Sequence, residues 1–328
     1  MQKSVSLNLN ELLKPINPYL IRVDEEIKKK LHTGISILDN SALHLFQKGG
    51  KKIRASLLLL GSGLKNKIPE DIIEIAAAVE IVHGATLIHD DIIDHSLFRR
   101  GDVTVQKKWG NKVAVLVGDF MYTKALEVVV GDSRTHLFPE LISSAVDMLM
   151  GELYQMEYSN IDLINKKHYY KIIELKTAIF MATCVKLGAV QAEMSDEERD
   201  SLYQFGLNLG YAFQIIDDTL DYIEDRELVG KDGGNDFLNG KITLPFLHLL
   251  EVSAEKEKAK LTDYARNPDF SNWKIVRKSM MNSVAIDYCK GDAEKWVKKA
   301  LSYLDGFPST VYKETLINLT TFLVGREY

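Results

Sequence analysis

Hydrophobic and polar positions along this chain repeat with a helical period over most of its length. Between residues 70 and 95, apolar side chains recur at helical spacing, for example at Ile72, Ile75, Val79 and Val82. The same pattern predicts further long helices over residues 111–130, 137–159, 165–188 and 195–223. Runs of β-branched residues that alternate with polar ones are missing, so we expect no sheet. The pattern therefore predicts an all-α protein, a bundle of long antiparallel helices that forms a single domain over residues 1–328.

Glycine interrupts the helical pattern in one conspicuous stretch. Residues 229–236 read VGKDGGND, and residues 239–245 read NGKITLP. So many glycines predict a loop, and a long loop among helices often carries function.

Composition and charge narrow the possible classes of function. The 328 residues are 46% hydrophobic and 27% charged, which is typical of a soluble globular protein. The net charge of −5 argues against a general nucleic-acid binder. Cys184 and Cys289 lack the spacing of metal ligands, so we expect buried thiols in a reducing compartment. No apolar run approaches the ~18 residues of a membrane span, and the first residues do not form a signal peptide. A cytoplasmic protein without integral membrane contact is expected.

Two acidic clusters lie within predicted helices. The first is Asp90, Asp91 and Asp94 in HDDIID, and the second is Asp217, Asp218 and Asp221 in FQIIDDTLDY. Gln214 precedes the second cluster by one helical turn, so its polar residues share one stripe in an apolar segment.

The cost of placing carboxylates together makes these clusters informative. Two carboxylates about 4 Å apart repel by roughly 4 kcal/mol at an effective dielectric constant near 20. A divalent cation offsets this repulsion, and oxygen ligands that act with phosphates suit Mg²⁺. One cluster alone could be a solvated acidic face. Two copies of DDxxD with apolar flanks favour metal sites instead.

Basic residues near both clusters could hold anions. Lys51, Lys52 and Arg54 follow Gly49 and Gly50, and the glycines let a ligand approach the backbone. Further basic residues near the clusters are Arg99, Arg100, Lys176, Lys231 and Lys241. Each of them alone is typical of a surface charge. Together with two acidic metal sites, they indicate a pocket for two diphosphate groups.

These motifs and their order resemble the trans-isoprenyl diphosphate synthase family, and most closely its long-chain bacterial members such as octaprenyl diphosphate synthase. The resemblance rests on GGKKIR (49–54), VHGATLIHDDIIDHSLFRRG (82–101), GDFMYTKA (118–125), LKTA (175–178), FQIIDDTLDY (213–222), GKDGGND (230–236) and GKITLP (240–245). It implies the isoprenoid synthase type I fold, with helices around a central active-site cavity, and a homodimer.

The resemblance also implies a role for each matching residue. Asp90, Asp91, Asp94, Asp217 and Asp218 would hold about three Mg²⁺ ions against an allylic diphosphate, with Asp221 beside them. Arg99, Lys176, Lys231 and Lys241 would contact the same diphosphate, with Thr177 and Gln214 nearby. Lys51, Arg54, His83 and Arg100 would bind isopentenyl diphosphate. The family usually has Arg at position 52 and Pro at position 55, where this chain has Lys52 and Ala55, a difference that bears on loop geometry.

The implied reaction is electrophilic prenyl transfer. The six aspartates and Lys176 are the predicted catalytic residues, because cations stabilise the departing pyrophosphate. The double bond of isopentenyl diphosphate then attacks the allylic cation, and a proton is lost to the pyrophosphate. Ligand-binding or structural roles are therefore expected for His83 and His89, rather than general-base roles.

Product length depends, by the resemblance, on the residues just before the first aspartate cluster. Ala85 and Thr86 are small there, and Tyr122, Ala125, Leu126 and Val129 are candidate lining on the next helix. Small and aliphatic walls leave room, so we expect an all-trans product of about C30 to C50, with C40 favoured and farnesyl diphosphate as the primer. Ordinary helix packing is the alternative explanation for Ala85.

Several other functions would share part of this pattern. A farnesyl or geranylgeranyl diphosphate synthase would use the same motifs. A non-catalytic subunit of a heteromeric synthase usually loses metal-binding aspartates, whereas this chain keeps all six. A class I terpene cyclase normally replaces the second DDxxD by an Asn/Ser/Glu motif. An HD-type phosphohydrolase would leave the second cluster and Arg99-Arg100 unexplained.

Overall fold

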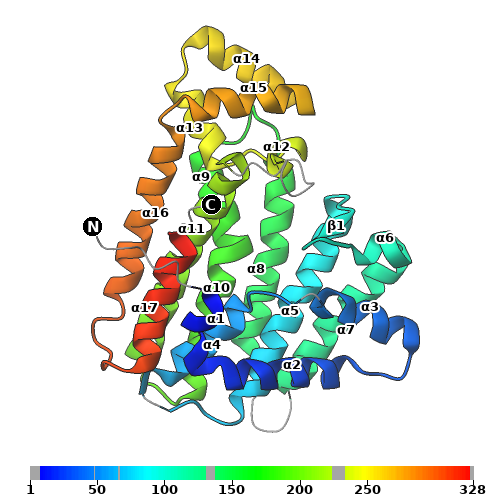
Figure 1. Ribbon diagram of the computed structural model, residues 1–328, viewed down its shortest axis with the longest axis vertical. Coiled ribbons are helices and arrows are strands. Elements are labelled where there is room, and N and C mark those ends of the chain that lie inside the picture. The colour runs from blue at the N-terminus through cyan, green and yellow to red at the C-terminus, as the bar shows by residue number, and fades with distance from the viewer. Residues whose placement is uncertain (1–7, 48, 66, 131–136, 224–232, 326–328) are drawn as a thin grey trace. The chain divides into compact units, whose positions relative to one another are not determined.

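The computed structural model describes residues 8–47, 49–65, 67–130, 137–223 and 233–325. Within them the chain forms two compact units. Unit 1 comprises residues 1–145, 183–203 and 306–319, and unit 2 comprises residues 146–182, 204–305 and 320–328. The predicted all-α class is confirmed, since helices dominate both units (Figure 1).

Unit 1 is built from the N-terminal helices. Its elements are α1 (Leu9–Leu12), η1 (Lys14–Ile16), α2 (Asn17–Leu31), α3 (Ser36–Gln47), α4 (Ile53–Ser62), η2 (Gly63–Lys65), α5 (Ile72–Ile93), β1 (Phe98–Arg99), β2 (Asp102–Val103), α6 (Val105–Trp109) and α7 (Asn111–Val130). Four helices contribute residues to both units: α8 (Phe138–Glu157), α10 (Ile179–Gln191), α11 (Asp196–Ile223) and α17 (Val311–Val324).

Helix α5 is the central element of unit 1. It is apolar on nearly all sides, which is typical of a helix buried in a core. It packs along α7, and two glycines permit the close approach. A Cβ at Gly118 would lie 2.1 Å from His89 Nε2, and one at Gly84 would lie 2.7 Å from Met121 Cε.

The length and apolar composition of α5 also satisfy the criteria for a membrane-spanning helix, contrary to the expectation from the sequence. However, 72% of its most apolar window is buried within the protein. The core helix of a protein outside the membrane meets the same criteria when it is buried in this way.

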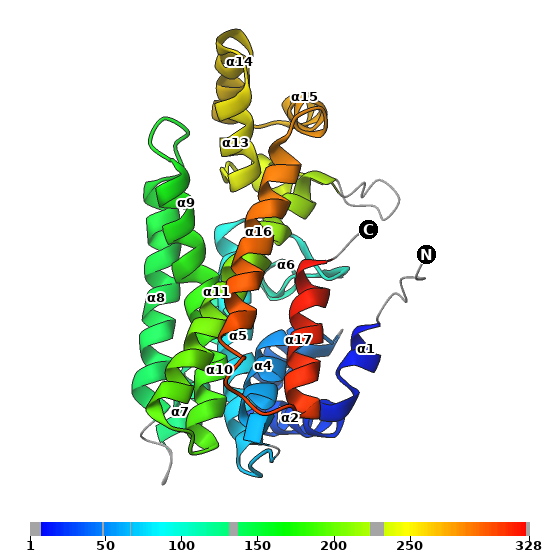
Figure 2. The same ribbon diagram turned by 90° about the vertical axis from the view of Figure 1, so that its left-hand side faces the viewer.

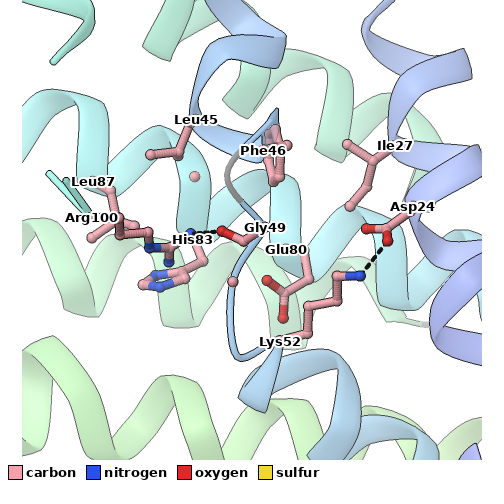
Figure 3. Close-up of a pocket in the computed structure, with 12 residues that line it drawn as sticks. Asp24, Ile27, Leu45, Phe46, Gly49, Lys52, Glu80, His83, Leu87 and Arg100 are labelled. Carbon is pink, nitrogen blue, oxygen red and sulfur yellow. Dashed lines mark hydrogen bonds and ion pairs between the residues drawn. The ribbon is translucent and has the colours of Figure 1, made fainter. Parts of the chain in front are cut away.

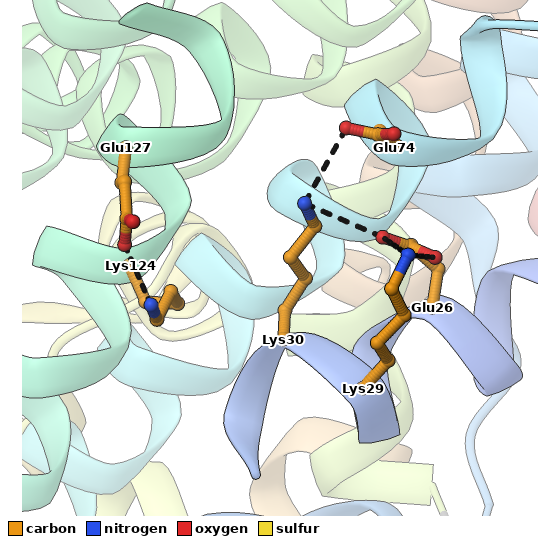
Figure 4. Close-up of polar contacts among 6 residues, drawn as sticks. All are labelled: Glu26, Lys29, Lys30, Glu74, Lys124 and Glu127. Atoms are coloured by element: carbon orange, nitrogen blue, oxygen red, sulfur yellow. Dashed lines mark hydrogen bonds and ion pairs between the residues drawn. The ribbon is translucent and has the colours of Figure 1, made fainter. Parts of the chain in front are cut away.

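A small group of ion pairs links α2 to α5 (Figure 4). Lys30 Nζ lies 3.4 Å from a carboxylate oxygen of Glu74 on α5 and 3.4 Å from one of Glu26 on its own helix. Lys29 adds a 3.2 Å contact to Glu26. These pairs are partly exposed, so each contributes little, and the apolar face of α2 supplies most of the attachment through Leu20, Val23, Ile27 and Leu31.

Unit 2 holds the C-terminal helices. They are α9 (Lys166–Ile173), the π-helical turn η4 (Glu174–Ala178), α12 (Asn235–Leu238), α13 (Leu244–Val252), α14 (Glu255–Arg266), α15 (Phe270–Met281) and α16 (Ala285–Ser302). Figure 2 shows α9 beside α8. The η4 turn lies very close to α11, because a Cβ at Gly210 would lie 2.4 Å from Ala178 Cα.

The five predicted long helices are all present, and their ends differ from the predicted ones by a few residues. The range 165–188 differs most, since α9, the η4 turn and α10 follow one another there. The predicted loop was only partly right: residues 224–232 lie outside the described ranges, and Asn235–Leu238 form α12.

The expectation that no sheet forms was wrong for one short hairpin. β1 and β2 pair antiparallel through a two-residue turn of Arg100 and Gly101, whose φ angles are +52° and +76°. Positive φ at both turn residues matches the twist of a hairpin. Strands of two residues are too short to show an alternating pattern in the sequence.

Candidate active site

The first aspartate cluster ends α5 in unit 1. Asp91 is buried, and Asp90 and Asp94 are half-buried. Asp94 is the residue after the helix, where its N–H donates to Asp90 O at 2.8 Å. Arg99 Nε donates to Asp91 Oδ1 at 2.8 Å. Arg99, which the resemblance directs to a diphosphate, is therefore held by a carboxylate of the predicted metal site in its own unit.

The β1–β2 hairpin places the two arginines. Gln106 of α6 donates its amide to Ser96 O at 2.8 Å, and Thr104 N–H donates to Leu97 O at 3.0 Å. The turn at residues 100–101 then directs Arg99 toward Asp91 and Arg100 toward Gly49, to whose carbonyl it donates at 2.9 Å.

A pocket lies beside this hairpin, also within unit 1, and its polar lining includes the cations Lys52 and Arg100, the carboxylates of Asp24 and Glu80, and His83 (Figure 3). Arg54 donates to His83 Nε2 at 2.9 Å. Arg100 passes over Gly50, where a Cβ would lie 2.7 Å from the guanidinium. Three of the four residues predicted to bind isopentenyl diphosphate, Arg54, His83 and Arg100, thus come together, and Lys51 is exposed on the adjoining loop.

His83 is held neutral in this pocket. Burial, followed by the positive charges of Arg54, Arg100 and Arg99, lowers the pKa of His83 well below its usual value. A neutral ring can accept a hydrogen bond from Arg54. His89, in contrast, lies against α7, with its Nε2 atom 3.3 Å from Val115 O and its ring stacked on Tyr122.

The second aspartate cluster lies on α11 in unit 2. Asp217 is exposed, whereas Asp218 is buried and accepts hydrogen bonds from Tyr169 OH and Gln214 Nε2, each at 2.7 Å. The Thr177 hydroxyl donates to Gln214 Oε1 at 2.8 Å. Three hydrogen bonds thus link Thr177, Gln214, Asp218 and Tyr169 in series and orient the Asp218 carboxylate. Burial, and then the charges of Asp236 and Asp217, raise the pKa of Asp218 well above its usual range.

Asp221 has a different local role. Its carboxylate accepts the backbone N–H groups of Gly234, Asn235 and Asp236 at 3.0–3.3 Å, and so holds the start of α12. That attachment brings Asp236 close enough to act on the pKa of Asp218. Sequence reasoning missed Asp236 as a member of this acidic group, although it lies in the glycine-rich motif.

Lys176 and Thr177 lie on the η4 turn. π-Helical turns inside helices are frequent at functional sites, because they reorient side chains. Lys176 Nζ contacts the Glu152 carboxylate and donates to Gln155 Oε1 at 2.5 Å. Both partners are on α8 and were missed in the sequence, where GELYQ (151–155) is their signal. Lys241 is half-buried in unit 2, and Lys231 lies outside the described residues.

The candidate chain-length residues are inside unit 1. Ala85 and Val129 are fully buried on the paired helices α5 and α7. Thr86 is half-buried, and its hydroxyl donates to His83 O at 2.8 Å.

The donor set fits a hard divalent cation. Each cluster presents only carboxylate oxygens. A cation beside Asp218 would oppose the burial and the charge repulsion that raise the pKa of this carboxyl group. Over the described residues, no three His, Cys, Asp or Glu side chains lie close enough together to form a complete site on their own.

A family model described as polyprenyl synthetase matches residues 35–282. The chain belongs to the polyprenyl synthetase family. The chain is 33% identical to component 2 of heptaprenyl diphosphate synthase from Geobacillus stearothermophilus, over 94% of this chain and 96% of that protein. It is 31% identical to octaprenyl diphosphate synthase from Escherichia coli, over 98% and 100%. Short-chain isoprenyl diphosphate synthases are also among its relatives.

Solved structures agree with this assignment. The structure of a polyprenyl synthase from Caulobacter crescentus, complexed with calcium and isoprenyl diphosphate, superimposes with a TM-score of 0.92 at 32% identity. The alignment covers 98% of each chain. The polyprenyl synthetase therefore has the fold of the prenyl diphosphate synthases.

Replacement of His83 by Gln tests the neutral state of this residue. The unfolded chain takes up a proton at His83 near pH 6.5, whereas the folded chain does not. The wild type should therefore lose stability as the pH falls below about 6.5, by up to about 1.4 kcal/mol per pH unit more than His83→Gln. Urea unfolding at pH 7.5, 6.5 and 5.5 measures this difference. Parallel profiles for the two proteins would show that His83 is protonated in the fold.

Proposed function

We propose that this polyprenyl synthetase condenses an allylic diphosphate with successive isopentenyl diphosphate units, releasing pyrophosphate at each step. The observation that carries the proposal is the pair of buried aspartates, Asp91 and Asp218, each oriented by hydrogen bonds within a DDxxD motif. Burial of a carboxylate is costly, so a structural role alone would not favour both motifs.

Mg²⁺ is the proposed cofactor. Asp90, Asp91, Asp94, Asp217 and Asp218 would hold about three ions, with Asp221 beside them as the residue that fixes α12. When bound, the ions supply positive charge to the departing pyrophosphate. The calcium bound by the Caulobacter crescentus polyprenyl synthase supports a divalent cation in this fold.

The basic residues divide between the two substrates. For the allylic diphosphate we propose Arg99, Lys176, Lys231 and Lys241, with Thr177 and Gln214 nearby. For isopentenyl diphosphate we propose Lys51, Arg54, His83 and Arg100, because His83 and Arg100 line one pocket and Arg54 donates to His83. His83 binds rather than abstracts a proton, because its Nε2 atom already accepts from Arg54. The proton of the condensation leaves with pyrophosphate.

A long product is proposed, about C30 to C50 with C40 favoured, because the family resemblance places a wall of the elongation pocket just before the first aspartate cluster, where Ala85 and Thr86 are small. Farnesyl diphosphate is the proposed primer. The named relatives range from short-chain to octaprenyl synthases, so family membership by itself does not select a length.

A homodimer in the cytoplasm is proposed as the working form. Helix α8 supports it, because Val146, Leu149, Met150, Leu153 and Met156 form an apolar stripe in which each residue is 46–66% exposed. A second copy would bury this stripe. The single domain over residues 1–328 also stays a proposal, supported by a family match that runs through residues of both units.

The activity itself is tested with purified protein, Mg²⁺, farnesyl diphosphate and labelled isopentenyl diphosphate. We expect label in a polyprenyl diphosphate, loss of activity with EDTA and recovery with Mg²⁺. Asp91→Asn and Asp218→Asn should each lower kcat/KM by about 10³-fold, since each removes a metal-binding charge. Asp200→Asn, an exposed change on α11, is the control. Incorporation only after a second protein is added would favour a heteromeric subunit, and a cyclised hydrocarbon would favour a terpene cyclase.

Product length is tested by Ala85→Tyr. A tyrosine ring at this position would extend from the proposed wall into the elongation pocket, so we expect a product shorter by several isoprene units. Reversed-phase chromatography of the dephosphorylated products measures the length. Ala85→Ser, which keeps the side chain small, should leave it unchanged. An unaltered product from folded Ala85→Tyr would assign Ala85 to ordinary packing.

The proposed dimer is tested by light scattering after gel filtration. We expect twice the chain mass of 37.1 kDa for the wild type. The double variant Leu149→Glu/Leu153→Glu should run as a monomer, because two charges would have to be buried at the interface. Ile275→Glu on α15, where the side chain is 46% exposed, is the matched control. A monomeric wild type, or a dimer that survives the double change, would contradict the assignment of α8.

A further inference from the structure

A buried carboxylate lines the same pocket as His83 and Arg100 and has no role in the reaction proposed above. Glu80 of α5 is 8% exposed and precedes His83 by one helical turn. Figure 3 shows its carboxylate beside Lys52. Its Oε1 atom accepts the N–H of Ala55 at 2.9 Å.

That hydrogen bond ends on the first turn of α4, which carries Arg54. The helix begins after Lys52, whose φ of +45° is left-handed and whose side chain does not cap the helix. Instead, the Lys52 amine pairs with Asp24 of α2. The first N–H groups of a helix need acceptors from elsewhere, and a carboxylate suits the positive end of the helix dipole. Glu80 provides such an acceptor from another helix.

The charges around Glu80 are positive. Burial raises the pKa of Glu80 above its usual value, and the Ala55 N–H together with the charges of Arg54, Arg100 and Lys52 opposes only part of that rise. Arg54 and Arg100 belong to different segments, and like charges repel most strongly where water is excluded. Glu80 lines the same pocket as Arg100, and its hydrogen bond ends on the residue after Arg54, so a negative charge there reduces this repulsion before any substrate is bound.

We propose that Glu80 is a positioning residue for isopentenyl diphosphate, whose buried charge holds Arg54 and Arg100 in place for the diphosphate group. This inference rests on the proposed function, since it assumes that Arg54, His83 and Arg100 bind that substrate. Residues held in the bound geometry lose less freedom when a ligand arrives, so a preorganised cluster binds more tightly.

Glu80→Gln tests the proposal, because the amide removes the charge but keeps an oxygen for the Ala55 N–H. Calorimetric titration with isopentenyl diphosphate should give a Kd about tenfold higher than that of the wild type. In the steady state, KM for isopentenyl diphosphate should rise by a similar factor. KM for the allylic substrate and kcat should stay within about twofold. Unchanged affinity, or an equal loss for both substrates, would overturn the proposal.

Two further variants separate charge from structure. Glu74→Gln makes the same chemical change on α5 at the partly exposed ion pair with Lys30, and should leave all constants unchanged. Ala55→Pro removes the N–H but not the carboxylate, in a helical turn that accepts proline. It should change the Kd by less than about threefold. A loss as large as that of Glu80→Gln would mean that Glu80 only caps α4.

If Glu80→Gln does not reach the circular dichroism of the wild type, Glu80→Asp replaces it, since aspartate keeps the charge but withdraws it by one methylene. We expect about threefold weaker binding of isopentenyl diphosphate, and wild-type affinity would overturn the proposal. Label incorporation and the measured Kd test the proposed function and the role of Glu80 separately. Absence of label incorporation by the wild type would refute the proposed function, whereas the ratio of the two Kd values reports on Glu80 alone.

Discussion

Carboxylate groups are costly to bury away from water, and this cost constrains the arrangement of the described parts of the candidate site. Asp91 and Asp218 are buried among apolar helices, where an unpaired charge would be very unfavourable. Each is therefore held by specific partners: Arg99 for Asp91, and Tyr169 with Gln214 for Asp218. These partners restrict the carboxylates to one orientation. Electrostatic catalysis requires such preorganisation, because groups that need not move cost nothing when the reaction occurs.

Helix α5 illustrates how a core helix can also carry chemistry. Because it is apolar and buried nearly all round, any polar residue on it needs a partner from another element. Glu80 accepts from the backbone of α4, His83 accepts from Arg54, and Asp91 accepts from Arg99. These hydrogen bonds link α4 and the β1–β2 hairpin to α5, and those elements carry Arg54, Arg99 and Arg100.

In unit 2, a distorted helix supplies a partner to the residues that hold a buried carboxylate. The η4 turn carries Lys176 and Thr177 and packs against Gly210 of α11 without space for a Cβ. Thr177 then reaches Gln214, which reaches Asp218. Asp221 extends the network by fixing α12, so that Asp236 lies near the same carboxylate. A change in the backbone at η4 would therefore reach the aspartate cluster through a short chain of bonds.

The sequence by itself determined the helical class, the long helices and both aspartate clusters. Helical periodicity and DDxxD spacing are local properties, so they can be read without coordinates. Only the tertiary structure decided that Asp91 and Asp218 are the buried members, that Asp221 binds the start of α12, and that Glu80, Glu152, Gln155 and Asp236 lie near predicted site residues of their own units. The two-residue strands, the π-helical turn and the helix at Asn235–Leu238 were also missed. These features were missed for one physical reason. Burial, pairing between distant segments and close backbone approach all depend on what surrounds a residue in space, and a local sequence pattern does not contain that information.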